Sequence, residues 1–417
     1  MFESSRVPPA LRFGDFRLLV IGVLATGLAN QMIDVAIGWQ VYAVRRSALD
    51  LGLIGLAEFV PLMLLALPAG HLADRLPRRA MFGASIGLNI VVAAFLLLVT
   101  LEGASQLWPF IVLAAASGAV SALGNPAARA LPPALVPREL LASSLALRSM
   151  AMRIGSIVGP AIGGILFAWH GELVYAVAIA LFLVALACIA ALRVPAVERD
   201  PSAPPSPRLD SVLAGVRLIR QTPVLLGAIS LDLFAVLFGD AIALLPLFTR
   251  SILLLGPAGL GLLRAAPSLG GLLAATILAV RPLRRHCGRT LLVVVAGFGA
   301  CMIVFGLSRS FGLSFAALAI GGFLDMISIN IRSTVAAIAS PDELRGRVLA
   351  VEMVFISASN ELGAFESGLA AALLGAVPAV VAGGVVTIAL AAAWTRLFPP
   401  LAEIDRLEDL RPVAQKV

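Results

Sequence analysis

The sequence GHLADRLPRR, residues 70–79, separates two long apolar segments, residues 51–69 and 80–101. Short loops rich in arginine are typical of the cytoplasmic side of membrane proteins, where they join two spanning helices. The stretch therefore predicts a hairpin of two membrane-spanning helices. Its small, acidic and basic residues are Gly70, Asp74, Arg75, Arg78 and Arg79.

The composition extends this prediction to the whole chain of 417 residues. Hydrophobic residues make up 60% of it, charged residues only 13%, and the mean hydropathy is +1.01. About 20 apolar residues span the hydrocarbon core of a bilayer as a helix, and runs of this length recur along the chain. The net charge of +7 comes almost wholly from arginines in short loops, which indicates membrane topology rather than nucleic-acid binding. We therefore expect an all-α protein embedded in a lipid bilayer.

Twelve apolar segments form two sets of six. The first set covers residues 16–44, 49–73, 78–101, 107–130, 140–168 and 173–193, and the second covers 222–248, 257–281, 290–307, 311–335, 347–373 and 378–397. The Pro- and Ser-rich segment between the sets ends in an amphipathic stretch, residues 211–221, which predicts a helix on the membrane surface. The expected parts are a first half at 1–193, a cytoplasmic linker at 194–221, a second half at 222–397 and a cytoplasmic tail at 398–417.

The distribution of arginines orients the chain. Most of them fall in the loops on the side of the central linker, and the alternate loops hold only Arg45, Arg46, Arg250 and Arg309. Because positively charged loops stay in the cytoplasm, the linker and both termini are expected there.

The two halves also repeat each other. The sequence ALVPRELLASSLALR from Ala134 is similar to AIASPDELRGRVLAV from Ala337, at an offset of about 204. At this offset Gly159 falls on Gly363, and Gly164 falls on Gly368. Transporters built from such repeats place their substrate site between the halves, near the middle of the membrane.

Two six-helix halves, a long linker and GHLADRLPRR after the second segment resemble the major facilitator superfamily, over nearly the entire chain. The motif there is Gly-x-x-x-Asp-Arg/Lys-x-x-Arg-Arg/Lys. Further stretches, among them GWQVYAV, GLGLLRAAPSLGG and RLFPPL, resemble the bacterial branch of the enterobactin exporter and related drug:proton antiporters. The resemblance implies a secondary transporter in the bacterial inner membrane.

In such a transporter the motif at residues 70–79 is expected to form a cytoplasmic latch. Asp74 can accept hydrogen bonds from the start of a neighbouring helix, where the dipole favours an anion. The corresponding loop of the second half, VRPLRRHCGR from Val280, keeps the arginines and has no acid. The latch is therefore expected in the first half, with the helix near Arg345 as partner; the alternative is that the arginines only fix topology.

A second motif, GSIVGPAIGG at residues 155–164, resembles the antiporter motif of the superfamily's exporters. Small residues at this spacing let two helices approach closely, and a proline kinks a helix. The motif favours export, although close helix packing alone also accounts for it. Its residues are Gly155, Gly159, Pro160, Gly163 and Gly164.

Charged residues inside spanning segments are functional candidates, because each costs about 2.5–3.5 kcal/mol to insert. Asp34 shares one helix face with Asn30 and is the first candidate for proton coupling; Asp325 is the second. The resemblance places four acids beside the central path: Asp34, Asp232, Asp240 and Asp325. Arg153, Arg264 and Arg332 are expected partners, and structural ion pairs are the alternative role.

Asp325 and Arg332 lie about 10 Å apart along one helix, so they are expected to flank a ligand or to pair across helices. The segment at 107–130 has no arginine at its middle, which departs from the proton relay of the drug antiporters.

These features together predict a proton-coupled exporter of a siderophore or an amphiphilic drug, acting as a monomer. The alternatives are a proton-coupled importer of a metabolite on the same fold and a polytopic enzyme or receptor. No catalytic, nucleotide-binding or metal-ligand spacing supports an enzyme, and no cofactor is expected.

Overall fold

The computed structural model describes residues 8–103, 105–193 and 209–410. Within these residues the regular structure is helical and no strand is present. Twelve of the described helices are long and apolar enough to cross a membrane, as the sequence predicted.

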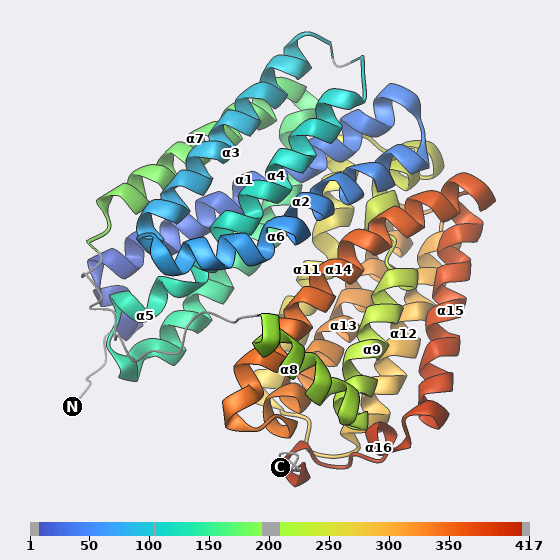
Figure 1. Ribbon diagram of the computed structural model, residues 1–417. Coiled ribbons are helices and arrows are strands. Elements are labelled where there is room, and N and C mark those ends of the chain that lie inside the picture. The colour runs from blue at the N-terminus through green and yellow to red at the C-terminus, as the bar shows by residue number, and fades with distance from the viewer. Residues whose placement is uncertain (1–7, 104, 194–208, 411–417) are drawn as a thin grey trace. The chain divides into compact units, whose positions relative to one another are not determined.

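The spanning helices of the first six are α1 (Gly14–Arg45), α2 (Ala48–Arg75), α3 (Arg78–Leu101), α4 (Trp108–Ala130), α6 (Leu141–Trp169) and α7 (Gly171–Ala191) (Figure 1). The spanning helices of the second six are α9 (Pro223–Gly239, with short continuations to Ile252), α11 (Pro257–Val280), α12 (Cys287–Leu307), α13 (Phe311–Ala339), α14 (Asp342–Leu374) and α15 (Ala376–Leu397).

Short helices connect or extend them. They are η1 (Pro9–Arg12), α5 (Pro132–Leu135), η2 (Arg138–Leu140), α8 (Leu209–Gln221), η3 (Ile242–Leu244), α10 (Leu245–Leu247), the π-helix η4 (Phe248–Ile252), α16 (Pro399–Ala402) and η5 (Leu407–Asp409).

The chain divides into two compact units. The first contains Met1–Arg46, Ala57–Ser206 and Leu255–Ala265, and the second contains Ser47–Leu56, Pro207–Leu254 and Ala266–Val417. The start of α2 therefore belongs to the second unit, and the start of α11 belongs to the first.

In the first unit, α6 and α7 pack along α1, and α3 packs along α4 and α7 (Figure 1). The glycines of the predicted antiporter motif produce the close contact between α6 and α1. A Cβ added at Gly159 would lie 2.7 Å from the Cβ of Gln31, and one added at Gly163 would lie 2.8 Å from the Cα of Met32. The structure thus shows helix packing as one function of this motif, and α6 continues as a helix through Pro160.

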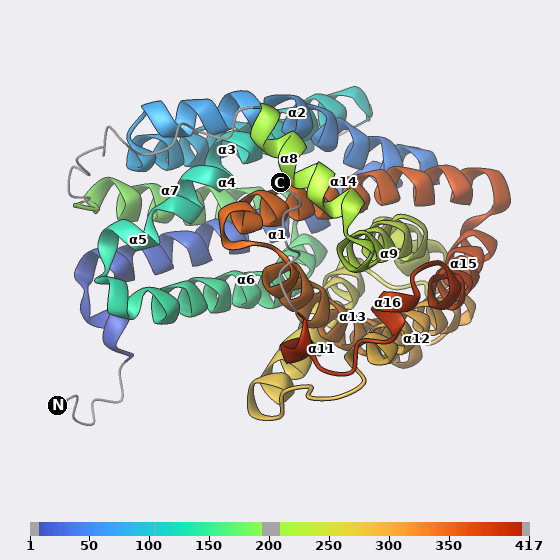
Figure 2. The same ribbon diagram turned by 60° about the horizontal axis from the view of Figure 1, so that its bottom comes forward.

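In the second unit, α12 packs along α13 and α15, and α9 packs along α14 and α15. Helix α8 lies against α14 and α9 (Figure 2). Its apolar side chains Leu218 and Ile219 are buried in the core of the unit. The predicted helix is confirmed, and these two side chains face protein; the placement of the helix on the membrane surface stays a prediction. An amphipathic pattern does not distinguish a protein surface from a lipid surface.

Equivalent glycines show the internal repeat in three dimensions. A Cβ added at Gly164 of α6 would lie 3.0 Å from the Cα of Gly261 in α11, within the first unit. A Cβ added at Gly368 of α14 would lie 2.8 Å from the Cα of Gly52 in α2, within the second unit. Each unit thus uses the same small-residue contact between equivalent helices.

The seventh spanning segment was predicted as one continuous helix over residues 222–248, but the helix is interrupted in the structure. Helix α9 ends at Gly239, and the Oδ1 atom of Asp240 accepts a hydrogen bond of 3.0 Å from the backbone N–H of Ile242. This side chain satisfies a local backbone donor and starts a new helical turn, so the acid that seemed to lie inside a helix marks its interruption.

Candidate functional site

Two arginines of the motif at residues 70–79, the loop motif, bind the ends of two helices in the first unit. Arg78 donates a hydrogen bond of 2.9 Å to the carbonyl oxygen of Ala130, at the end of α4. Arg79 donates to the carbonyl oxygens of Ile189, at 3.0 Å, and of Ala190, at the end of α7. Terminal carbonyls of a helix lack partners within it and carry the negative end of its dipole, so both contacts are favourable.

The other members of the loop motif are less defined. A Cβ added at Gly70 would meet no described atom within 4 Å, so packing in the first unit does not require glycine there. The side chains of Asp74 and Arg75 lie outside the part of the structure that is described.

The first charged centre is an ion pair in the first unit. The Nη2 atom of Arg264, at the start of α11, lies 3.3 Å from the Oδ2 atom of Asp34 in α1. The side chain of Asp34 is 37% exposed and that of Arg264 is 23% exposed. Asn30, one turn earlier on α1, is exposed as well. The predicted polar face of α1 is therefore accessible and holds one acid paired with one base.

This pair lies far from the linker end of its unit, the end at which α7 finishes. Asp15, at the start of α1, accepts a hydrogen bond of 2.8 Å from the backbone N–H of Arg193, so α1 begins at the linker end. Asp34 lies about 30 Å along the helix from that start, and Arg264 lies about 10 Å from the other end, where α11 begins.

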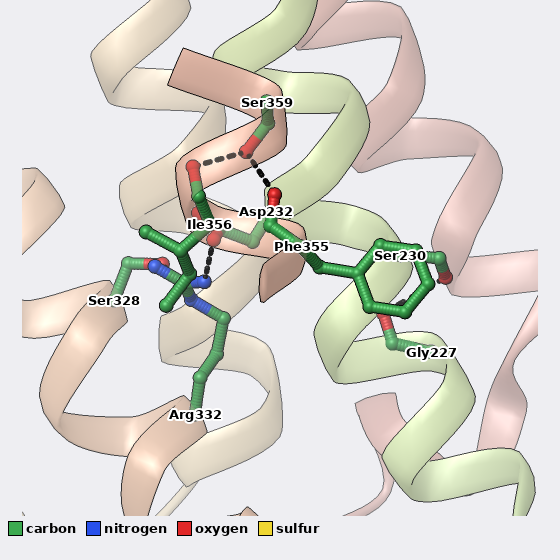
Figure 3. A network of polar contacts seen from close by, with 8 residues as sticks. All are labelled: Gly227, Ser230, Asp232, Ser328, Arg332, Phe355, Ile356 and Ser359. Carbon is green, nitrogen blue, oxygen red and sulfur yellow. Dashed lines mark hydrogen bonds and ion pairs between the residues drawn. The ribbon is translucent and has the colours of Figure 1, made fainter. Parts of the chain in front are cut away.

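The second charged centre is in the second unit, where α9, α13 and α14 meet. The Nη1 atom of Arg332 forms an ion pair with the Oδ2 atom of Asp232, and its Nε atom donates a hydrogen bond of 3.1 Å to the Oγ atom of Ser328 (Figure 3). The side chains of Asp232 and Arg332 are only 9% and 4% exposed. Glu352 of α14 is also buried and close enough to both residues to interact electrostatically.

The second centre contains more acid than base. Asp232 pairs directly with Arg332, and Glu352 lies within electrostatic reach of it. All three residues lie about 10–15 Å from the ends of their helices at which α9 begins, α13 ends and α14 begins. The sequence marks Asp232, Arg332 and Glu352 alike as charged residues inside spanning segments. Nothing in it indicated that Glu352 comes within electrostatic reach of Arg332.

The remaining candidates occupy separate places. Asp325 lines a small pocket with Asp232 and Ser328, on the side of the second centre away from the linker end. Arg332 pairs across helices, which is one of the two arrangements expected for it. Asp240 lines another pocket with Glu366 and Ser367, and Arg153 lies half-buried on α6.

Two arginines expected as partners of intramembrane acids thus form ion pairs, Arg264 with Asp34 and Arg332 with Asp232. The structure groups the candidates into two separate centres, one in each unit. The sequence did not indicate this grouping, because it depends on contacts between helices that are distant along the chain.

Comparisons with known proteins agree with the fold. The model of the family described as transmembrane secretion effector matches residues 5–415. The enterobactin exporter EntS of Citrobacter koseri is 30% identical over 416 residues, covering 97% of this chain and 95% of the relative. EntS of Escherichia coli O1:K1 is 30% identical over 378 residues, covering 89% and 86%.

Solved transporters share the architecture at low identity. A bacterial homologue of the human lysosomal transporter Spinster, inward-facing and unoccupied, has a TM-score of 0.74 at 16% identity, covering 95% of this chain and 99% of that one. A D-xylose–proton symporter has a TM-score of 0.70 at 13% identity, covering 94% and 98%. The chain belongs to the major facilitator superfamily, in its transmembrane secretion effector family, and is a multi-pass membrane transporter rather than an enzyme.

Proposed function

We propose that the chain exports a small organic molecule, a siderophore or an amphiphilic drug, across the bacterial inner membrane in exchange for protons. Both termini lie in the cytoplasm and the unit of transport is a monomer. Export is supported by the secretion-effector family and by the enterobactin exporters that match nearly the whole chain.

The observation that carries the proposal is the accessible ion pair between Asp34 and Arg264. A charged pair within spanning helices is expensive to build, and this one keeps more than a third of the Asp34 side chain exposed. A partly exposed carboxylate is open to both protons and a substrate, whereas a buried one is closed to a substrate.

The chemistry of Asp34 makes the proton and the substrate compete. An ionised carboxylate only accepts hydrogen bonds, and a protonated one has lost much of that capacity and become a donor. A substrate rich in hydroxyl or amide donors therefore binds Asp34 in its ionised form and leaves when a proton arrives. Arg264 holds the ionised carboxylate in place while neither is bound. Alternating access converts this competition into antiport.

Replacing Asp34 with asparagine tests the coupling. In inside-out vesicles, Asp34→Asn is expected to abolish accumulation of a labelled siderophore driven by a proton gradient, with normal membrane insertion. Glu102→Gln, at the exposed end of α3, is the matched control and keeps transport. Unchanged transport by Asp34→Asn contradicts the proposal, and proton-driven uptake into right-side-out vesicles favours the metabolite importer.

The loop motif is proposed as the cytoplasmic latch of the cycle. Arg78 and Arg79 bind the ends of α4 and α7 at the start of α3, which follows directly on the end of α2 that carries Asp74. Asp74→Asn is expected to increase the labelling of cysteines introduced on the cytoplasmic side of the expected substrate path. Identical labelling of the parent and the variant would mean that the motif only fixes the membrane topology.

A further inference from the structure

The second charged centre has an unbalanced charge. Asp232, Arg332 and Glu352 would carry a net charge of −1 if all three were ionised, and each is less than 10% exposed. An uncompensated charge in a poorly solvated site costs several kcal/mol, and such a site reaches neutrality most cheaply by binding a proton to an acid. We infer that Glu352 holds a proton while Arg332 pairs with Asp232, so the second unit contains a proton-binding site separate from Asp34.

The contacts identify Glu352 as the protonated acid. Asp232 forms the direct ion pair with Arg332, and Ser328 accepts the hydrogen bond from the Nε atom of the guanidinium (Figure 3). Among the described residues, Glu352 makes no ion pair within 4.0 Å although it lies within electrostatic reach of Arg332. The arginine is thus committed to Asp232, and Glu352 stays uncompensated unless it is neutral.

The helices around α14 supply no other described cation at this depth. Helix α9 carries only Asp232, and α13 adds only Asp325 to Arg332. Helix α8 carries Arg217 and Arg220, and α15 carries Arg396. These three arginines and Arg347 of α14 are exposed near the linker end. Asp50 of α2 lies near Gly368, about 24 Å further along α14. Within the second unit, the described cations of these helices other than Arg332 therefore lie away from the centre.

A small pocket adjoins the centre. It is lined by Asp232 of α9 and by Ser328 and Asp325 of α13. An apolar cluster that includes Val351 of α14, Val335 of α13 and Leu218 and Ile219 of α8 packs around the centre. The pocket therefore gives a proton on Asp232 a place to pass to.

Within the proposed antiport, on which this role rests, the centre is a proton store that changes with the position of Arg332. When Arg332 turns from Asp232 toward Glu352, the glutamate ionises and the stranded Asp232 takes up the proton, so the centre stays neutral. Such a two-position arginine couples a rearrangement of α9, α13 and α14 to the transfer of one proton from Glu352 to Asp232, which lines the pocket.

Infrared difference spectroscopy of the full chain in lipid nanodiscs, without substrate, tests the protonation directly. A protonated carboxyl group has a C=O stretching band that a carboxylate lacks. At neutral pH the parent is expected to show this band, and Glu352→Gln is expected to lose it. Asp232→Asn is expected to lose it too, because one acid then remains for one arginine and Glu352 ionises.

Asp34→Asn is the control and keeps the band. The inference is overturned if the parent lacks the band, or if either Glu352→Gln or Asp232→Asn retains it in full. Thermal unfolding provides a second readout: glutamine mimics a protonated glutamate, so Glu352→Gln should keep the parent's unfolding temperature, and a large drop would mean an ionised, paired glutamate. Because no transport is measured, a failure of the proposed antiport leaves these outcomes unchanged.

Discussion

The two charged centres use the same pair of residue types in opposite ways. In the first unit, Asp34 and Arg264 form a balanced and accessible pair, whose carboxylate is 37% exposed. In the second unit, Asp232, Arg332 and Glu352 form an acid-rich and sealed group, whose aspartate is 9% exposed. Exposure suits the exchange of ligands, and burial suits the retention of a proton. In the account proposed here, burial and charge balance, rather than the presence of an acid in a helix, separate the two roles.

Of the two arginines, Arg332 should have the larger effect on thermal stability when it is removed. Arg332→Leu leaves two acids without a base in a buried site, and breaking a buried pair in this way costs about 3–5 kcal/mol. Thermal unfolding of the purified protein should show a large drop. Combining Arg332→Leu with Asp232→Asn and Glu352→Gln removes the stranded charges and should recover most of the loss. An equally unstable triple variant would contradict the charge argument.

Removing Arg264 should have a small effect on stability and a large effect on transport. The stranded carboxylate of this half-buried pair keeps some access to solvent, so Arg264→Leu should lower the unfolding temperature much less than Arg332→Leu. Transport should fall strongly, because Asp34 loses the partner that holds it in place. A drop in stability as large as that of Arg332→Leu would show that the two centres do not differ as described.

Much of the fold is predictable from hydropathy and arginine placement. The twelve spans follow from apolar runs of membrane length, and the repeat near residues 159–164 and 363–368 follows from matching glycines. The break at Asp240 was not predictable, because an acid inside an apolar run looks the same whether it lies within a helix or caps one. The packing of α8 against α14 and α9 was not predictable for a similar reason, since Leu218 and Ile219 suit either lipid or protein.

The candidate site was predictable in its members more than in its arrangement. Asp34, Asp232 and Arg332 stand out because charge is rare in spanning segments. Their partners come from helices far away along the chain: Arg264 lies 230 residues from Asp34. Only the packing of α14 against α9 and α13 brings Glu352 within electrostatic reach of Arg332.

Proton release on substrate binding tests the central claim most directly. Purified protein in weakly buffered detergent solution, with a pH-sensitive dye, is mixed with a siderophore ligand. At a pH where a fraction of Asp34 is protonated, the parent should release protons as the ligand binds, and Glu352→Gln should still do so. Asp34→Asn should release none, even at ligand concentrations that saturate it. The same release from Asp34→Asn as from the parent would contradict competition between proton and substrate at the accessible centre.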